Sequence, residues 1–194
     1  MPSTHPIDFG SAQLVLDAAG ALYWPHYGVL VISDLHLEKA SFLSQFGSLL
    51  PRYDTRATLG KLTALMEQYQ PQQVICLGDS FHDAKAYGRL EAQDREQLMA
   101  LAQRAAHWHW VLGNHDPAVD GALPGQRHAQ LEIGGLLFSH EREESPLPQI
   151  IGHFHPKLTL RLKGSRVSGP AFVKASQLMV MPAFGSFTGG LSVE

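Results

Sequence analysis

Five short motifs rich in aspartate, histidine and asparagine follow one another along the chain. In order, they are Asp34-Leu35-His36, Gly78-Asp79, Gly113-Asn114-His115-Asp116, Ser139-His140 and Gly152-His153-Phe154-His155. The set offers imidazoles, carboxylates and one amide but no thiolate, a mixture that suits divalent cations of intermediate hardness. Two such cations can activate water and neutralise phosphoryl oxygens. The motifs therefore predict a dinuclear metal site for hydrolysis.

Each motif follows a run of β-forming apolar residues. These runs cover residues 29–33, 74–77, 108–112, 136–138 and 150–151. A strand end is rigid and the loop beyond it opens onto a cleft, so five strand ends can direct their side chains to one point. Any one of these motifs could serve turn formation alone. Five of them in order, each after a strand, favour a shared site.

The residue types suggest how the ligands divide between two cations. Asp79 is the candidate to bridge them, because a carboxylate can use one oxygen or both. Two pairs alternate on extended segments, so each pair shares a face and can bind one cation: Asp34 with His36, and His153 with His155. An amide oxygen and a further imidazole come from Asn114 and His140.

The composition is that of an ordinary globular protein. The chain has 194 residues, of which 44% are apolar and 17% are charged, and we expect one domain over residues 1–194. The net charge of −3 argues against a surface coated in positive charge for gripping nucleic acid. Two cations would offset several carboxylates in the cleft, so a nucleic-acid substrate stays possible.

The cysteine content and the apolar runs of the sequence indicate the cellular compartment in which we expect the protein. Cys76, the one cysteine, lies in a predicted buried strand, which indicates a small buried hydrophobe and no disulfide framework. The first residues lack the basic and apolar regions of a secretory signal, so we expect a cytoplasmic protein. No apolar run approaches the ~20 residues needed to cross a bilayer, and no membrane partner is expected.

The pattern of elements changes along the chain. An opening hairpin over residues 13–17 and 21–24 precedes the first motif, and helices are predicted over 39–46, 55–69 and 90–106, with Asp54 capping the second. After Pro124, closely spaced short strands follow. A βαβα front half and a β-rich back half predict an α/β (α+β) fold, a four-layer αββα sandwich of two mixed β-sheets flanked by helices.

The order of the motifs resembles the calcineurin-like metallophosphoesterase superfamily over Val29 to His155. Further segments resemble one bacterial branch, the DNA ligase-associated metallophosphoesterases, which are DNA damage response endonucleases. These segments are Leu22-Tyr23-Trp24-Pro25, Ser33 to Lys39, Leu77 to His82, Gly152 to Pro156 and Met181 to Leu191. The resemblance implies the metallophosphoesterase fold for nearly the whole chain.

The resemblance also implies roles for the site residues. One metal would be held by Asp34, His36, Asp79 and His155, and the other by Asp79, Asn114, His140 and His153. His115 would protonate the leaving oxygen or stabilise the transition state, and Asp116 would fix its tautomer and direction. The nucleophile would be a metal-bridging hydroxide that attacks phosphorus in line. Manganese is the usual activator in the superfamily, although iron, zinc and cobalt accept the same ligands.

The spacing of the motifs leaves little material for a cap domain, so we expect an open cleft suited to a polymer. The branch resemblance implies a DNA-repair nuclease that works beside an ATP-dependent DNA ligase and a helicase. Two alternatives are a phosphodiesterase for cyclic nucleotides or other small phosphodiesters, and a non-catalytic scaffold of the same fold. His82 and Asp83 could contact the substrate or lie in a solvated loop. Arg142 and Lys157 could each contact a phosphate, although an ion pair with the acidic residues between Glu141 and Glu144 competes for Arg142.

Overall fold

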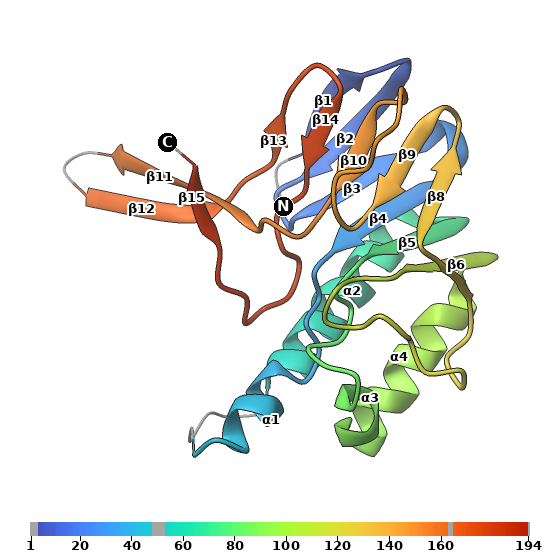
Figure 1. Ribbon diagram of the computed structural model, residues 1–194, viewed down its shortest axis with the longest axis vertical. Coiled ribbons are helices and arrows are strands. Elements are labelled where there is room, and N and C mark those ends of the chain that lie inside the picture. Colours follow the sequence, from blue (N-terminus) through green and yellow to red (C-terminus); the bar gives the residue numbers. More distant parts are fainter. Residues whose placement is uncertain (1–3, 48–52, 163–164, 194) are drawn as a thin grey trace.

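The computed structural model describes residues 4–47, 53–162 and 165–193. Seven strands form the first sheet, in the order in which they occur along the chain (Figure 1). Strands β1 to β4 pair antiparallel, and β4 to β7 pair parallel. These strands are β1 (Thr4–Phe9), β2 (Ala12–Asp17), β3 (Ala21–Trp24), β4 (Val29–Ser33), β5 (Gln73–Leu77), β6 (His107–Val111) and β7 (Gln126–His128).

The second sheet has five strands in the order β13-β14-β10-β9-β8, and β9, β10 and β14 run parallel. A three-stranded sheet, β12-β11-β15, projects from the body as an arm (Figure 1). The strands of these two sheets are β8 (Gln130–Ile133), β9 (Leu136–Ser139), β10 (Gln149–Ile151), β11 (Pro156–Leu162), β12 (Ser165–Pro170), β13 (Val173–Lys174), β14 (Leu178–Val180) and β15 (Leu191–Val193).

The four α-helices of the described residues lie between residues 39 and 104 and gather on one side of the first sheet (Figure 1). They are α1 (Lys39–Ser44), α2 (Asp54–Tyr69), α3 (Ala86–Arg89) and α4 (Ala92–Arg104), and a 3₁₀ turn, η1, covers Pro25–Tyr27. Among the described residues, none of the helices combines the length and the apolar character needed to span a membrane.

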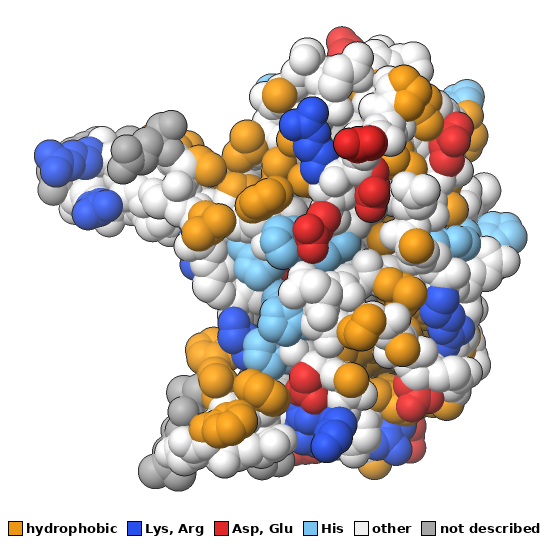
Figure 2. All heavy atoms as spheres, in the orientation of Figure 1, with side chains coloured by type: hydrophobic (Ala, Val, Ile, Leu, Met, Phe, Trp, Pro, Cys, Tyr) orange, Lys and Arg blue, Asp and Glu red, His pale blue; other side chains and the backbone are white. Residues whose placement is uncertain are grey.

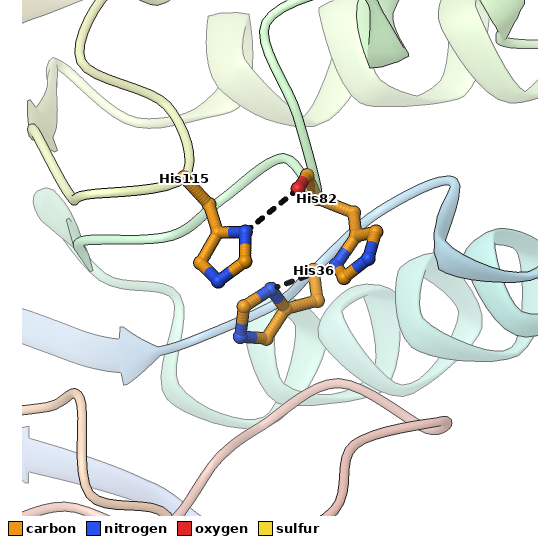
Figure 3. A group of neighbouring side chains, drawn as sticks. All are labelled: His36, His82 and His115. Carbon is orange, nitrogen blue, oxygen red and sulfur yellow. Dashed lines mark hydrogen bonds between the residues drawn. The ribbon is translucent and has the colours of Figure 1, made fainter. Parts of the chain in front are cut away.

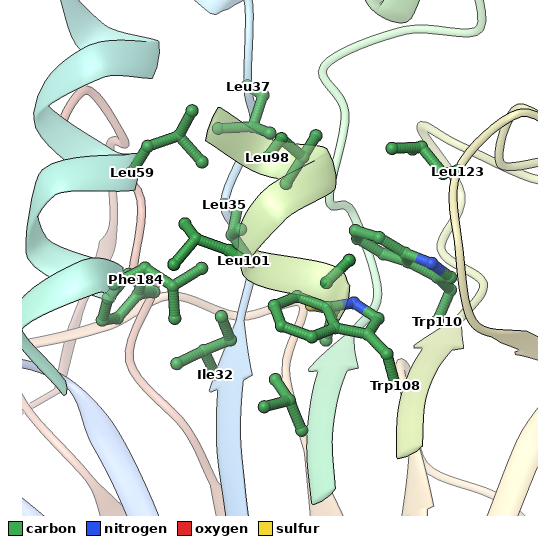
Figure 4. Packing of buried hydrophobic residues seen from close by; sticks show 14 of the residues in the cluster. Ile32, Leu35, Leu37, Leu59, Leu98, Leu101, Trp108, Trp110, Leu123 and Phe184 are labelled. Atoms are coloured by element: carbon green, nitrogen blue, oxygen red, sulfur yellow. The ribbon is translucent and has the colours of Figure 1, made fainter. Parts of the chain in front are cut away.

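The core divides into two clusters because side chains alternate along each central strand. On one face, Ile32 packs with Leu59 of α2, Leu98 of α4 and Trp108 (Figure 4). On the other face, Val31 packs against the second sheet through residues that include Phe138. The central strands are buried on both faces and are therefore rigid supports for the loops that follow them.

The expected α/β class with two mixed sheets is confirmed. The layers of the described residues are helices, first sheet and second sheet, so the second helical layer of the predicted sandwich is not formed by them. The connection from β9 to β10, residues 140–148, contains no helix, and Gln149 exchanges hydrogen bonds with the backbone of Glu143 at 2.9 and 2.8 Å. A connection this short has no room for the helix that usually joins parallel strands.

The predicted opening hairpin and the helices are also confirmed, with small shifts at their ends. The predicted capping role of Asp54 is wrong, because α2 has Tyr53 at its cap position and no side-chain cap. The Asp54 carboxylate instead accepts a hydrogen bond from the Ala40 backbone at 3.0 Å. Asp54 thus links α2 to α1 and does not cap the start of α2.

Candidate metal centre

Side chains at the ends of five strands gather at one place on the surface. The strands are β4, β5 and β6 of the first sheet and β9 and β10 of the second. Figure 2 shows the histidines of this group as a pale-blue cluster beside a hollow below the arm. The seven predicted ligands all contribute to the cluster: Asp34, His36, Asp79, Asn114, His140, His153 and His155.

The backbone of this cluster has an uncommon conformation. Five of the seven predicted ligands have positive φ angles, in the left-handed region that residues other than glycine rarely adopt. They are Asp34 (52°), His36 (44°), Asp79 (43°), His153 (69°) and His155 (46°). Such residues persist only where the surrounding structure holds them, and they concentrate at functional sites. Here the loops after β4 and β5 stabilise each other, because His36 N–H donates to the Asp79 carbonyl at 2.9 Å.

One half of the cluster is formed by the loops after β4 and β10. Asp34 Oδ1 lies 3.1 Å from His155 Nε2, and His36 Nε2 lies 3.3 Å from the same nitrogen. Burial lowers the pKa of His36 to about 3, against the opposing effect of Asp79. This imidazole is therefore neutral at ordinary pH, which is the form that binds a cation.

The other half is formed by the loops after β6, β9 and β10. Asn114 Oδ1 lies 2.9 Å from His140 Nε2 and 3.2 Å from His153 Nδ1. The two imidazole nitrogens are themselves 3.2 Å apart. This half therefore presents one amide oxygen and two imidazoles to a common point.

Asp79 lies between the two halves. Its Oδ2 is 3.8 Å from His36 Nε2 and 3.4 Å from His140 Nε2. Burial acts to raise the pKa of Asp79, but hydrogen bonds from His140 and from the His115 backbone outweigh it and lower the pKa to about 2. Asp79 is therefore an ionised carboxylate that faces both groups of ligands, the position required of a bridge.

The donor atoms fit divalent cations. Imidazole nitrogens that face one another at about 3.2–3.3 Å repel through their lone pairs unless a proton or a cation lies between them. Oxygen and imidazole donors without thiolates suit the first-row divalent metals. Four groups of the described residues have ligand atoms within 4.8 Å of one another: Asp34, His36 and His155; Asp34, Asp79 and His140; His140, Glu141 and His153; and His36, His82 and His115.

Two supporting groups were not identified from the sequence. The Ser33 hydroxyl donates to Asp34 Oδ2, and the His153 backbone N–H donates to the same carboxylate at 3.1 Å. Glu141 lies within ligand distance of His140 and His153 although its side chain is exposed. Ser33 stands directly before the first motif, and this adjacency is the signal that could have found it.

The structure brings His115 to the edge of the cluster but corrects the expected role of Asp116. His115 Nδ1 donates to the backbone carbonyl of His82 at 2.9 Å (Figure 3). Asp116 instead accepts hydrogen bonds from the backbone N–H groups of Phe81 at 3.1 Å and Gly113 at 3.0 Å. Asp116 therefore ties two loops together, and His82 fixes the tautomer of His115.

Burial also affects Asp116. It raises the pKa of Asp116 to about 6, against the backbone hydrogen bond from Phe81, and the nearby charge of Asp79 acts in the same direction as burial. Two like charges in a poorly solvated region explain this direction. Asp116 is thus a structural group beneath the cluster.

His82 lies against the cluster, so it is not part of a solvated loop. Its ring stacks on that of His115 with centroids 5.2 Å apart, and its Nδ1 is 3.4 Å from His36 Nδ1 (Figure 3). The remaining open residues lie apart: Asp83 pairs with Arg89, Arg142 is exposed, and Lys157 Nζ donates to the Thr188 carbonyl at 3.5 Å. The loop after β5 therefore brings the imidazole of His82 to the cluster, whereas the carboxylate of Asp83, the next residue, pairs with Arg89.

Comparison with known proteins identifies the family. Residues 27–171 match the model of the calcineurin-like phosphoesterase family. The chain belongs to this family. Its members use two metal ions, and together with the His and Asp cluster this makes the chain a metal-dependent phosphoesterase, a hydrolase. No curated protein matches the sequence.

Among solved structures, the phosphoesterase fold of this chain is similar to that of the nuclease MPE of Pseudomonas putida. The TM-score is 0.79 at 29% sequence identity, over 98% of this chain and 90% of the other. This match is consistent with the DNA ligase-associated branch. Yfce, a phosphoesterase from E. coli, gives a TM-score of 0.45 at 19% identity over 84% of this chain and 83% of the other.

Proposed function

We propose that this phosphoesterase is a dinuclear phosphodiesterase that acts as a nuclease on DNA. The position of Asp79 carries the proposal, because its Oδ2 faces both His36 and His140 from between two groups of donors. One cation is assigned to Asp34, His36, Asp79 and His155, and the other to Asp79, Asn114, His140 and His153. The loops that hold these side chains are anchored on central strands, which favours a preformed site.

Two bound divalent cations supply Lewis acidity toward a phosphate and a water of lowered pKa. The protein supplies the rest. His115 keeps its Nδ1 proton on the His82 carbonyl, so its Nε2 is free to carry a second proton toward the phosphate. A protonated Nε2 can stabilise charge that develops on a phosphoryl oxygen, or protonate the leaving oxygen.

Manganese is the proposed metal, supported by the mixture of imidazole and carboxylate donors that manganese shares with iron, zinc and cobalt. Elemental analysis of protein purified without added metal would identify it. A DNA substrate is supported by the likeness to a nuclease and by the open surface beside the cluster (Figure 2). The motif resemblance supports the further proposal that the protein acts in DNA repair beside an ATP-dependent DNA ligase and a helicase. A cytoplasmic location is proposed from the single, buried cysteine.

The test compares three substrates with manganese-loaded protein: bis(4-nitrophenyl) phosphate, 4-nitrophenyl phosphate and a single-stranded DNA oligonucleotide. We expect cleavage of the DNA and of the small diester, at a higher rate than hydrolysis of the monoester. Diester hydrolysis with intact DNA would favour a small phosphodiester as the substrate. No turnover of any substrate with both metals bound would favour a non-catalytic scaffold.

A His115→Ala variant separates metal binding from catalysis. We expect it to keep its metals, because His115 is not among the assigned ligands, and to lose diester hydrolysis by about 100-fold, in the range of a general acid. Elemental analysis and steady-state kinetics on bis(4-nitrophenyl) phosphate measure the two effects. Wild-type turnover in this variant would reject the role of His115.

A further inference from the structure

A groove of about 480 Å³ opens beside the metal cluster and has His155 in its wall. Its other walls come from the β2–β3 turn, from β12 and from residues 183–189, the segment that leads into β15. Lys61 of α2 and Lys157 of β11 also line it. We call this feature the lysine groove. It places two ammonium groups next to a candidate metal ligand.

Among the described residues, the polar contacts of these two lysines are with neutral groups. Lys61 Nζ donates to the carbonyl of Phe184 and lies 3.8 Å from the centre of the Phe184 ring. Lys157 Nζ has the Thr188 carbonyl at 3.5 Å. In the described part of the chain, neither lysine has a carboxylate within 4.0 Å, although Arg56 and Arg89 do. Partly buried cations without a counter-charge favour the binding of an anion.

A third lysine adds to this charge. Lys39 lies 6.0 Å from the centre of the Phe187 ring. Burial lowers the pKa of Lys39, Asp54 opposes this, and repulsion from Lys157 adds to the lowering. Three of the six lysines in the sequence thus gather here, in a chain of net charge −3. Two metal cations nearby would strengthen the attraction for an anionic chain.

The size and surroundings of the groove indicate the form of that anion. Its volume is in the range of pockets for small or extended ligands, and it is too small to enclose a duplex. Two exposed aromatic residues are neighbours in the chain of residues that line the groove: Phe187, between Ser186 and Thr188, is 42% exposed, and Phe154, next to His155, is 45% exposed. A positive groove combined with exposed aromatic rings is typical of surfaces that bind single-stranded nucleic acid.

We propose that the lysine groove binds the phosphodiester backbone of a single-stranded DNA segment next to the cleavage site. Lys61 and Lys157 contact its phosphates, and Phe187 offers a face for base stacking. This inference rests on the proposed nuclease function. It adds a binding site that guides the strand out of the metal centre along β11.

The test uses Lys61→Gln/Lys157→Gln, the single variant Lys157→Gln, and Lys61→Arg, which keeps the charge. Arg104→Gln is the matched control, since Arg104 is exposed at the end of α4, where β6 begins, away from the cluster. Affinity for a labelled single-stranded oligonucleotide is measured by fluorescence anisotropy with a chelator present, over a range of salt. Metal-loaded protein is then assayed on the oligonucleotide and on bis(4-nitrophenyl) phosphate.

We expect the double variant to bind the oligonucleotide about tenfold or more weakly at low salt, and its salt slope to fall by about 1.4, at about 0.7 for each phosphate contact. The slope of Lys157→Gln alone should fall by about half as much, and Lys61→Arg should stay near wild type. The ratio of oligonucleotide to small-diester hydrolysis should fall with the affinity. This ratio reports on the flanking strand rather than on the reacting phosphate.

Two results would overturn the lysine groove alone: wild-type affinity and salt slope in the lysine variants, or equal affinity of the wild type for a duplex of the same length. Small-diester hydrolysis by wild-type protein that does not bind the oligonucleotide would also overturn it, while leaving the phosphodiester chemistry intact. Wild-type protein that hydrolyses neither substrate would instead refute the proposed function.

Discussion

Asp79→Asn is expected to reduce diester hydrolysis by at least about 10³-fold. Residues that merely orient a metal ligand cost about 10–100-fold in metal affinity or activity when they are changed. Asp79 faces both groups of donors, with His36 Nε2 and His140 Nε2 at 3.8 and 3.4 Å from its Oδ2. Asparagine keeps the shape and one oxygen but loses the charge that the two proposed cations would share. Metal content by elemental analysis and kinetics on bis(4-nitrophenyl) phosphate measure the loss.

Glu67→Gln is the matched control for Asp79→Asn. It removes the same charge from an exposed position on α2, and its metal content and rate should equal those of the wild type. Asp79→Asn should still fold, because the asparagine oxygen can accept the His115 backbone N–H that Asp79 Oδ1 accepts at 2.9 Å. Two metals per chain and an undiminished rate in Asp79→Asn would refute the bridging assignment.

Gly113→Ala is expected to damage both stability and metal binding. A Cβ atom at Gly113 would lie 2.2 Å from Asp79 Oδ1 and 2.3 Å from the Asp79 backbone nitrogen. The Asp79 nitrogen cannot move without shifting the backbone that follows β5, and moving Oδ1 would break its hydrogen bond from the His115 backbone. We therefore expect a loss of about 1–3 kcal/mol in the free energy of unfolding, as for other overpacked sites. Urea denaturation measures this loss, and elemental analysis measures the accompanying loss of metal.

Gly121→Ala is the control for Gly113→Ala. Nothing lies within 4 Å of a Cβ atom built at Gly121, and this variant should match the wild type in stability within about 0.5 kcal/mol. Equal stability and equal metal content in the two variants would show that Gly113, after β6, does not approach Asp79, after β5, as closely as described. The comparison therefore tests the packing beneath Asp79 separately from its charge.

Much of the fold could be predicted because its determinants are local. The central strands are continuous apolar runs, and the apolar face of α2 recurs at helical spacing through Leu59, Leu62 and Met66, all of which are buried. The ligand cluster could be predicted because each motif directly follows such a strand. The residues that directly follow a strand decide which donor side chains lie at its end, and the pairing and packing of the strands bring these ends together.

Other features depend on contacts between distant segments. Asp116 follows His115 in the sequence, which favoured a pairing between them, yet the carboxylate accepts N–H groups from Gly113 and from Phe81 of a different loop. In the same way, Asp54 bonds to Ala40 rather than capping its own helix. Both residues have short carboxylate side chains whose partners are backbone groups, and no periodicity in a sequence identifies such partners.

The left-handed backbone at five of the seven candidate ligands limits how this scaffold could be redesigned. Aspartate, asparagine and histidine tolerate that conformation better than other side chains with a Cβ atom, and all three are oxygen or nitrogen donors. An engineer who wished to install a thiolate centre here would place cysteines at φ values between 43° and 69° and would meet steric strain at each one. The backbone conformation therefore restricts which metal-binding side chains laboratory evolution could introduce here, independently of which ligands a given metal prefers.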